Sequence, residues 1–395
     1  MAEHAGKPKV RFAGFTETWE QRKLGDLAEF NPKAELPTNF EYVDLESVVG
    51  TELINHRTQT KCTAPSRAQR LAQYGDLFYQ LVRPYQKNNY LFELNSENFV
   101  FSTGYAQLRP SVDGYFLMSL VQNEYFVQKV LDNCTGTSYP AINVNDLAEI
   151  NIYTSLKKSE QARIGTFFRQ LDRLVTLHQR KRGRLENIKK AMLEKMFPKN
   201  GADVPEVRFA GFTEAWEQRK LGDLAEFNPK AELPTNFEYV DLESVVGTEL
   251  INHRTQTKCT APSRAQRLAQ YGDLFYQLVR PYQKNNYLFE LNSENFVFST
   301  GYAQLRPSVD GYFLMSLVQN EYFVQKVLDN CTGTSYPAIN VNDLAEINIY
   351  TSLKKSEQAR IGTFFRQLDR LVTLHQRKVA LLQNIKKACL EKMFV

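Results

Sequence analysis

One stretch of the chain is dense in side chains that donate and accept hydrogen bonds. It begins with residues 65–70 (PSRAQR) and continues as residues 82–89 (VRPYQKNN). Arg and Lys neutralise phosphates, and Arg, Gln and Asn can form paired hydrogen bonds with purine edges in the major groove. A solvated polar loop, in which Arg67 pairs with a neighbouring acid, would have the same composition. The stretch therefore fits a nucleic-acid contact or an ordinary surface loop.

A second polar segment, residues 135–140 (TGTSYP), combines hydroxyl side chains with a glycine and a proline. Small hydroxyl side chains on a glycine-hinged loop can approach a nucleic-acid backbone or base edge closely. A plain connection into the strand that follows would look the same. Both interpretations of this loop stay open.

The chain contains a long internal repeat, because residues 10–198 recur as residues 207–395. A repeat of this length is a duplicated domain and not a solenoid unit of 20–50 residues. Within the repeat the copies differ at Thr18/Ala215, Arg182/Val379, Gly183/Ala380, Arg184/Leu381, Glu186/Gln383, Met192/Cys389 and Pro198/Val395.

Both polar segments therefore occur twice, and their side chains are our candidates for nucleic-acid contact. In the first copy they are Ser66, Arg67, Arg70, Arg83, Tyr85, Gln86, Lys87, Asn88, Thr135, Thr137 and Ser138. In the second copy they are Ser263, Arg264, Arg267, Arg280, Tyr282, Gln283, Lys284, Asn285, Thr332, Thr334 and Ser335.

Each copy ends in a predicted long helix, over residues 159–197 and 356–394. Apolar residues recur there at alternating steps of four and three from Ile164 onward, and we call these positions the seam. A helix with one apolar seam is stable when the seam is buried against a partner helix. The two long helices are therefore expected to pair with each other. His178 and His375 fall on the seam, where packing is expected rather than catalysis.

The rest of each copy has the pattern of a mixed α/β domain. Short stretches rich in aromatic and β-branched residues are typical of strands, and in the first copy they are residues 40–48, 76–82, 98–102, 106–109 and 150–153. Residues 115–131 have helical spacing. The expected fold class is α+β.

The composition is that of an ordinary globular protein of 395 residues, with 43% hydrophobic and 24% charged residues. The net charge of +5 is too small to indicate a nucleic-acid-binding protein by itself. The five cysteines form no C-x-x-C pair, which favours a reducing compartment. We find no signal peptide and no transmembrane run, and we expect a cytoplasmic protein with no membrane partner.

Motifs for catalysis are missing from the sequence. There is no Walker-type phosphate loop, no G-x-G-x-x-G, no histidine spacing for a metal and no Ser-His-Asp signature. Residues 31–33 (NPK) begin like the N-P-P-Y motif of amino-group methyltransferases but lack its second proline and its aromatic residue. This favours a binding protein without a metal or cofactor of its own. A stand-alone DNA methyltransferase or nuclease, and a protein-binding scaffold without DNA contact, are the alternatives.

In their order along the chain, these pieces resemble the specificity (S) subunits of type I DNA restriction–modification systems. The resemblance covers essentially the whole chain, and all of its pieces occur twice. In the first copy they are VRFAGF (10–15) with Trp19 and KLGD (23–26), the PSRA…GD…VRPY run, AIN (141–143) with Asp146-Leu147, EQARIG (160–165), HQRK (178–181) and LEKMF (193–197).

The resemblance implies two target recognition domains, separated by two long antiparallel helices in a pseudo-twofold arrangement. With the parts named after this resemblance, the repeat and the patterns of its segments divide the chain into a recognition domain (1–155), a spacer helix (156–197), a linker (198–206), a second recognition domain (207–352) and a second spacer helix (353–395).

The resemblance also implies a function. Each recognition domain reads one half of a split site in double-stranded DNA, and the helices serve as spacer and platform for two methyltransferase (M) subunits. Two restriction (R) subunits complete the complex. S-adenosylmethionine is then expected in M, and ATP and Mg²⁺ in the partner subunits, with no catalysis in this chain.

The sequence departs from the family's pattern in one respect. Recognition domains usually differ within a chain, whereas here they are the same apart from Thr18/Ala215. We therefore expect a palindromic target, with a half-site, a nonspecific spacer and the inverted complement of the half-site.

Overall fold

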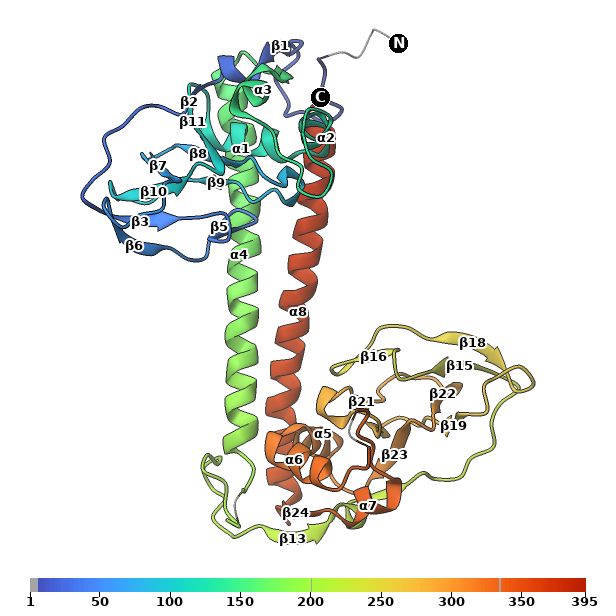
Figure 1. Ribbon diagram of the computed structural model, residues 1–395. Helices are drawn as coiled ribbons and strands as arrows, with labels where there is room; N and C mark the ends of the chain where they lie inside the picture. Colours follow the sequence, from blue (N-terminus) through green and yellow to red (C-terminus); the bar gives the residue numbers. More distant parts are fainter. Residues whose placement is uncertain (1–5, 200, 334) are drawn as a thin grey trace. The chain divides into compact units, whose positions relative to one another are not determined.

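The computed structural model describes residues 6–199, 201–333 and 335–395, and it has an α+β fold (Figure 1). The chain divides into two compact units. The first unit consists of two segments, the residues up to Gln179 and Arg377–Val395, and the second unit is Arg180–Gln376. Each unit therefore contains the domain of one copy, the beginning of that copy's long helix and the end of the other copy's long helix.

The elements of the first copy follow the chain in this order. They are β1 Glu20–Lys23, the 3-10 helix η1 Leu24–Asp26, β2 Ala28–Phe30, β3 Asn39–Val43, β4 Val48–Val49, β5 Glu52–Leu53, β6 Arg57–Thr60, β7 Ala68–Leu71, β8 Leu77–Gln80, the 3-10 helix η2 Pro84–Gln86, β9 Tyr90–Leu91, β10 Phe99–Ser102, β11 Tyr105–Pro110, α1 Gly114–Gln122, α2 Glu124–Asp132, α3 Val144–Glu149, β12 Asn151–Thr154 and α4 Lys158–Lys195.

The second copy repeats this order. Its elements are β13 Glu217–Lys220, η3 Leu221–Asp223, β14 Ala225–Phe227, β15 Asn236–Val240, β16 Val245–Val246, β17 Glu249–Leu250, β18 Arg254–Thr257, β19 Ala265–Leu268, β20 Leu274–Gln277, η4 Pro281–Gln283, β21 Tyr287–Leu288, β22 Phe296–Ser299, β23 Tyr302–Pro307, α5 Gly311–Gln319, α6 Glu321–Asp329, α7 Val341–Glu346, β24 Asn348–Thr351 and α8 Lys355–Met393.

In the first domain, one sheet has the strand order β6-β3-β10-β7 and another has the order β2-β11-β8-β9. The turn at Thr103–Gly104 joins β10 to β11 and so connects the two sheets. Phe78 of β8 and Phe101 of β10 stack beside this turn with ring centroids 3.6 Å apart. A Cβ on Gly104 would lie 2.9 Å from a side-chain carbon of Leu45, so the turn has no room for a larger residue. The Phe78–Phe101 stack thus packs a strand of one sheet against a strand of the other.

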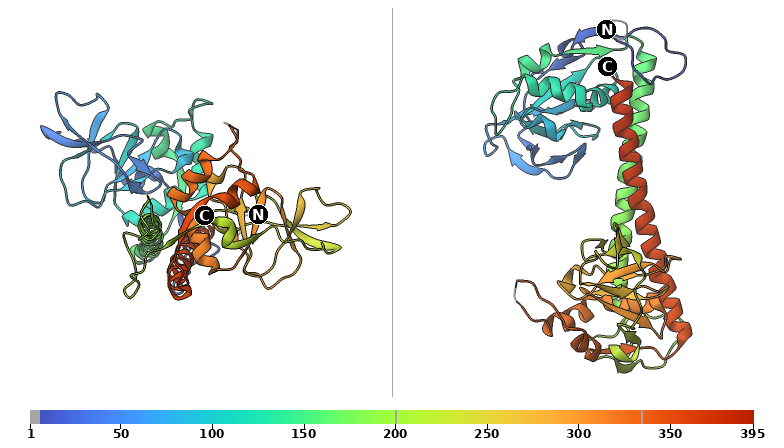
Figure 2. Two further views of the ribbon diagram at one scale, coloured as in Figure 1. Left: turned by 90° about the horizontal axis from the view of Figure 1, so that it is seen from below. Right: turned by 90° about the vertical axis from the view of Figure 1, so that its right-hand side faces the viewer.

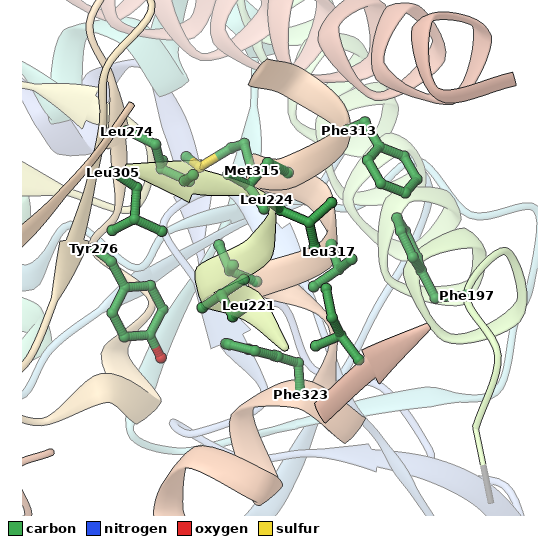
Figure 3. Packing of buried hydrophobic residues seen from close by; sticks show 14 of the residues in the cluster. Phe197, Leu221, Leu224, Leu274, Tyr276, Leu305, Phe313, Met315, Leu317 and Phe323 are labelled. Carbon is green, nitrogen blue, oxygen red and sulfur yellow. The ribbon is translucent and has the colours of Figure 1, made fainter. Parts of the chain in front are cut away.

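The end of α8 completes the core of the first unit, where it lies beside α1 and α2 (Figure 2). The Phe394 ring lies 5.9 Å from the rings of both Trp19 and Phe168, measured between centroids. The second unit has the same arrangement with the end of α4, and Figure 3 shows Phe197 beside Phe313 in its core. Neither domain core is therefore built from its own copy alone.

The predicted seam is confirmed, because every seam position of both long helices is buried or half-buried. Its lysines are neutralised within each unit: Lys386 forms an ion pair with Asp172 at 2.6 Å, and Lys189 forms one with Asp369 at 2.5 Å. In the first unit Phe168 meets Phe394, and four residues further along α4 Asp172 meets Lys386. The helix segments of a unit therefore run antiparallel, as predicted.

Two predicted elements are wrong in detail. Residues 115–131 form two helices, since Asn123 has an extended backbone and its side chain caps α2 by accepting a hydrogen bond from the Phe126 N–H at 2.8 Å. Residues 40–48 do not form one strand either. The Asp44 carboxylate accepts hydrogen bonds from the Ser47 hydroxyl and the Glu46 N–H, and this turn ends β3 before the short hairpin β4–β5 begins.

Candidate nucleic-acid interface

The first polar segment contains a loop with an uncommon backbone, residues 83–88, which we call the recognition loop. Arg83 and Lys87 both have left-handed conformations, with φ of 53° and 56°, on either side of the 3-10 helix η2. Non-glycine residues rarely adopt this region, and where they do the surrounding contacts hold them there. Arg280 and Lys284 repeat the conformation in the second copy. Such a backbone marks the loop as a candidate functional element.

Buried amides behind the recognition loop hold this conformation. The Gln80 backbone N–H donates to Asn89 Oδ1 at 2.9 Å, and both residues are buried. The Gln80 side-chain amide donates to the Val82 carbonyl at 2.6 Å and to Gln86 Oε1 at 3.0 Å. The loop is therefore fixed from below, while the side chains of Tyr85 and Gln86 are exposed.

The second polar segment lies directly against the recognition loop. Thr135 and Ala141 exchange backbone hydrogen bonds of 2.9 and 3.0 Å, which closes the segment into a hairpin-like loop. The Arg83 N–H donates to the Pro140 carbonyl at 2.7 Å, and the Arg83 guanidinium lies over the Tyr139 ring, 4.2 Å from its centroid. The same pair, Arg280 and Tyr336, is 5.5 Å apart in the second copy. The two candidate segments thus form one surface.

The Thr103–Gly104 turn connects the backbone at Arg67 with the backbone at Leu81, just before the recognition loop. The Thr103 N–H donates to the Arg67 carbonyl at 2.8 Å, and the Leu81 N–H donates to the Gly104 carbonyl at 2.9 Å. This turn therefore separates Arg67 from the beginning of the recognition loop by only a few residues. The side chains of Ser66 and Arg67 are exposed there.

Besides Arg83 and Gln86, three further candidate side chains are engaged in protein contacts. Arg70 lies half-buried in β7, where burial lowers the pKa of its guanidinium. Lys87 forms an ion pair with Glu124 of α2 at 2.7 Å. Asn88 accepts a hydrogen bond from the Gly50 N–H at 2.8 Å through its side-chain oxygen.

Of the remaining first-copy candidates Arg83 is half-buried, and the others are exposed at the surface. Thr135, Thr137 and Ser138 have exposed side chains, as do Thr332 and Ser335 in the second copy, while Thr334 lies outside the described residues. The contacts of Ser263, Arg264, Arg267, Arg280, Tyr282, Gln283, Lys284 and Asn285 match those of their first-copy counterparts. The interface role of the whole set stays a prediction.

Tyr85 was among the candidates predicted from the sequence, but Tyr139 and its counterpart Tyr336, which are also exposed, were not. Tyr139 is 63% exposed although it carries the Arg83 guanidinium on its face. A rigid aromatic ring on a loop offers a stacking or apolar contact to a nucleotide. The position of Tyr139 among the hydroxyl side chains of residues 135–140 was the sequence feature that could have indicated it as a candidate. The surface combines cationic donors, neutral amides, hydroxyls and an aromatic ring, a set suited to phosphate and base-edge contacts.

The described residues show no other chemistry of this kind. Among residues 6–199, 201–333 and 335–395, no group of His, Cys, Asp and Glu is arranged to hold a metal ion. Within the same ranges, no helix has both the length and the apolar character needed to cross a bilayer.

Comparisons with known proteins agree on one class. A family model described as the type I restriction modification DNA specificity domain matches residues 16–187 and again residues 213–384. A curated relative, the specificity subunit of the Type I restriction enzyme HindI from Haemophilus influenzae (strain ATCC 51907 / DSM 11121 / KW20 / Rd), is 23% identical over 195 residues. That match covers 46% of this chain and 41% of the relative, so it spans less than half of the relative's length.

Solved structures share the fold at low sequence identity. The type I restriction–modification S subunit from M. genitalium has a TM-score of 0.62 and 14% identity, over 98% of this chain and 99% of that one. A chain from a structure on complex assembly and conformational transition of the type I R-M system has a TM-score of 0.51 and 22% identity. This second likeness covers 94% of this chain and 96% of that one.

Proposed function

Since this chain belongs to the family of type I restriction modification DNA specificity domains, we propose that it is the DNA-reading subunit of a type I restriction–modification complex. The observation that carries the proposal is that the family match occurs twice and that both matches contain the same recognition loop, with Arg83 and Arg280 in the same left-handed conformation. Each copy then reads one half of a split site in double-stranded DNA.

The proposed target is a palindrome. Identical recognition loops prefer identical half-sites, because the same donors and acceptors face the bases. Within each unit the long-helix segments of the two copies run antiparallel, which favours half-sites of opposite direction over a direct repeat. The target is therefore a half-site, a nonspecific spacer and the inverted complement of that half-site.

The proposed complex assigns catalysis to partner subunits. M subunits bind S-adenosylmethionine and methylate adenine, R subunits use ATP and Mg²⁺ for translocation and cleavage, and this chain holds both in place in the cytoplasm. The long helices α4 and α8 are the proposed platform for two M subunits, and two R subunits complete the assembly.

An assay of the purified chain tests this division of labour. The chain alone, incubated with duplex DNA, S-adenosylmethionine, Mg²⁺ and ATP, is expected to leave the DNA unmodified and uncut. Addition of the M subunit is expected to produce a gel shift and methylated adenine. Methylation or cleavage by the chain alone would support a stand-alone enzyme, and a complex with M that never shifts DNA would support a scaffold without DNA contact.

A further inference from the structure

The hairpin β4–β5, residues 48–53, has no role in the surface described so far, yet it touches both the recognition loop and the long helix. We propose that this hairpin is a brace that fixes the orientation of the recognition loop on α4, and that it thereby sets which spacer lengths the protein accepts. The proposal rests on the proposed function as a reader of split DNA sites. Thr176 and Glu52 are its positioning residues.

The base of the brace is anchored in the domain core. Val48 is fully buried in a cluster with Val43 and Phe78. The Ile54 N–H donates to the Ser47 carbonyl at 2.9 Å, which closes the hairpin at its base. Because close-packed cores deform little, the base moves together with the domain.

The tip of the brace makes two hydrogen bonds in different directions. The Gly50 N–H donates to Asn88 Oδ1 of the recognition loop at 2.8 Å. The Thr176 hydroxyl of α4 donates to Glu52 Oε1 at 2.5 Å. Gly50 has a φ of 62°, the left-handed conformation that a two-residue hairpin turn uses at its first position. The tip therefore joins the recognition loop to the long helix.

A cleft lies beneath the brace, so the hairpin spans a hollow instead of packing flat on the helices. The cleft has a volume of about 540 Å³ and is lined by the hairpin, by Gln86 and Lys87, and by residues of α4 and α8 that include Val175 and Lys387. On the hairpin side, Val49 and Ile54 are 56% and 60% exposed. With so little apolar packing at the tip, the Glu52–Thr176 hydrogen bond links the tip to α4.

The second copy repeats every contact of the brace. The Gly247 N–H donates to Asn285 Oδ1 at 2.8 Å, and the Thr373 hydroxyl donates to Glu249 Oε1 at 2.5 Å. Lys284 pairs with Glu321 as Lys87 pairs with Glu124. Both recognition loops are thus tied to their own long helices in the same way.

Rigid attachment of the loop to the helix has a consequence for DNA. One additional base pair between half-sites moves the second half-site by about 3.4 Å and rotates it by about 35°, as follows from roughly 10.5 base pairs per turn of about 35 Å. A recognition loop that is held firmly on its long helix cannot reorient to match the rotated half-site, whereas a loop that has lost the brace can. Loss of the brace should therefore broaden the range of spacers without changing the bases that are read.

The test uses the full chain with its M subunit and a DNA library in which the spacer between the half-sites varies in length. The variant T176V/T373V removes both hydroxyl donors while keeping the size of the side chain. It is expected to raise methylation at spacers one base pair too long or too short by about threefold to tenfold relative to the preferred spacer, the effect of losing one solvent-exposed hydrogen bond of ordinary strength. The half-site sequence is expected to stay the same.

Two controls separate positioning from general damage. T58V/T255V removes the same kind of bond, from a Thr hydroxyl to a glutamate, at Glu41 and Glu238 on the sheet. This variant should keep the original spacer preference, as should T176S/T373S, which retains the hydroxyl. An unchanged spacer profile in T176V/T373V, or equal broadening in T58V/T255V, would overturn the brace. A wild-type chain that selects no split site would instead contradict the proposed function.

Discussion

Replacing Arg83 and Arg280 together by alanine is expected to weaken binding of the specific DNA site by about a hundredfold or more, since a bidentate Arg contact to a base contributes roughly 1–3 kcal/mol and two are lost. Arg83 also stacks on Tyr139 and lies where the two polar loops meet, so its removal frees the tyrosine as well. The measurement is a fluorescence-anisotropy titration of the complex with M, on specific and scrambled duplexes at one salt concentration.

Two further variants distinguish the possible roles of Arg83. Arg83→Lys with Arg280→Lys keeps the charge but loses the planar fork and its stacking. This pair is expected to bind scrambled DNA almost normally and to lose preference for the specific site. Lys87→Ala with Lys284→Ala should weaken binding to all sequences alike and reduce the salt dependence. Full specificity in the double Arg83 and Arg280 alanine variant would remove these arginines from the interface.

Replacing Arg11 by methionine is expected to lower the free energy of unfolding of the first unit by about 3 kcal/mol or more, because breaking a buried ion pair leaves a charge without its partner. Glu160 is 0% exposed. It accepts hydrogen bonds from Arg11 at 2.5 and 2.8 Å and from the Ser155 hydroxyl at 2.5 Å. This network of Arg11, Ser155 and Glu160 connects the N-terminal segment of the domain with the beginning of α4.

The tryptophans make this measurement specific to one unit. The Trp19 indole N–H donates to Glu160 Oε2 at 3.2 Å, so its fluorescence reports on the network. The chain has two tryptophans, and a Trp216→Phe background isolates Trp19 in a denaturant titration. Arg22→Met is the control, since its ion pair with Glu20 is exposed and should contribute less than about 1 kcal/mol. Equal effects of Arg11→Met and Arg22→Met would contradict the account of the buried network.

The same network predicts a dependence of stability on pH. Burial alone would raise the pKa of the Glu160 carboxyl, but hydrogen bonds from Arg11, Ser155 and Trp19 hold that pKa below its ordinary value. A carboxyl with a lowered pKa in the folded state stabilises the protein above its unfolded pKa of about 4.3. That contribution is lost as the pH falls through the lower folded pKa, so Arg11→Met should show a weaker loss of stability in acid than the wild type.

Local patterns in the sequence were sufficient to predict the repeat, the α+β class and the long helices. The helices begin and end within two residues of the expected positions, since their seams extend over many turns and each turn repeats the signal. The break between α1 and α2 at Asn123 was not predicted, because the helical pattern of apolar residues continues through it and only a single capping side chain marks the break. The division of the chain at residues 155, 197, 206 and 352 stays a prediction.

The candidate surface could be predicted only in part. The sequence identified residues 82–89 and 135–140 as separate polar segments, but their contact depends on the pairing of Arg83 with Pro140 and Tyr139 across many intervening residues. The left-handed conformation of Arg83 could not be predicted from the sequence either, since the position is not occupied by glycine, the residue that usually marks such a backbone. The link from Glu52 to Thr176 is more distant still along the chain. Such contacts are properties of the folded chain and leave little trace in local composition.

The proposed function requires that the two identical recognition domains of this chain select an inverted repeat in DNA. Genome-wide mapping of methylated adenines, in cells that carry this chain with its M subunit, tests that claim directly. We predict one motif, consisting of a short half-site, a spacer of fixed length and the inverted complement of the half-site, methylated on both strands. Two unrelated half-sites, or the same half-site repeated in one direction, would contradict it.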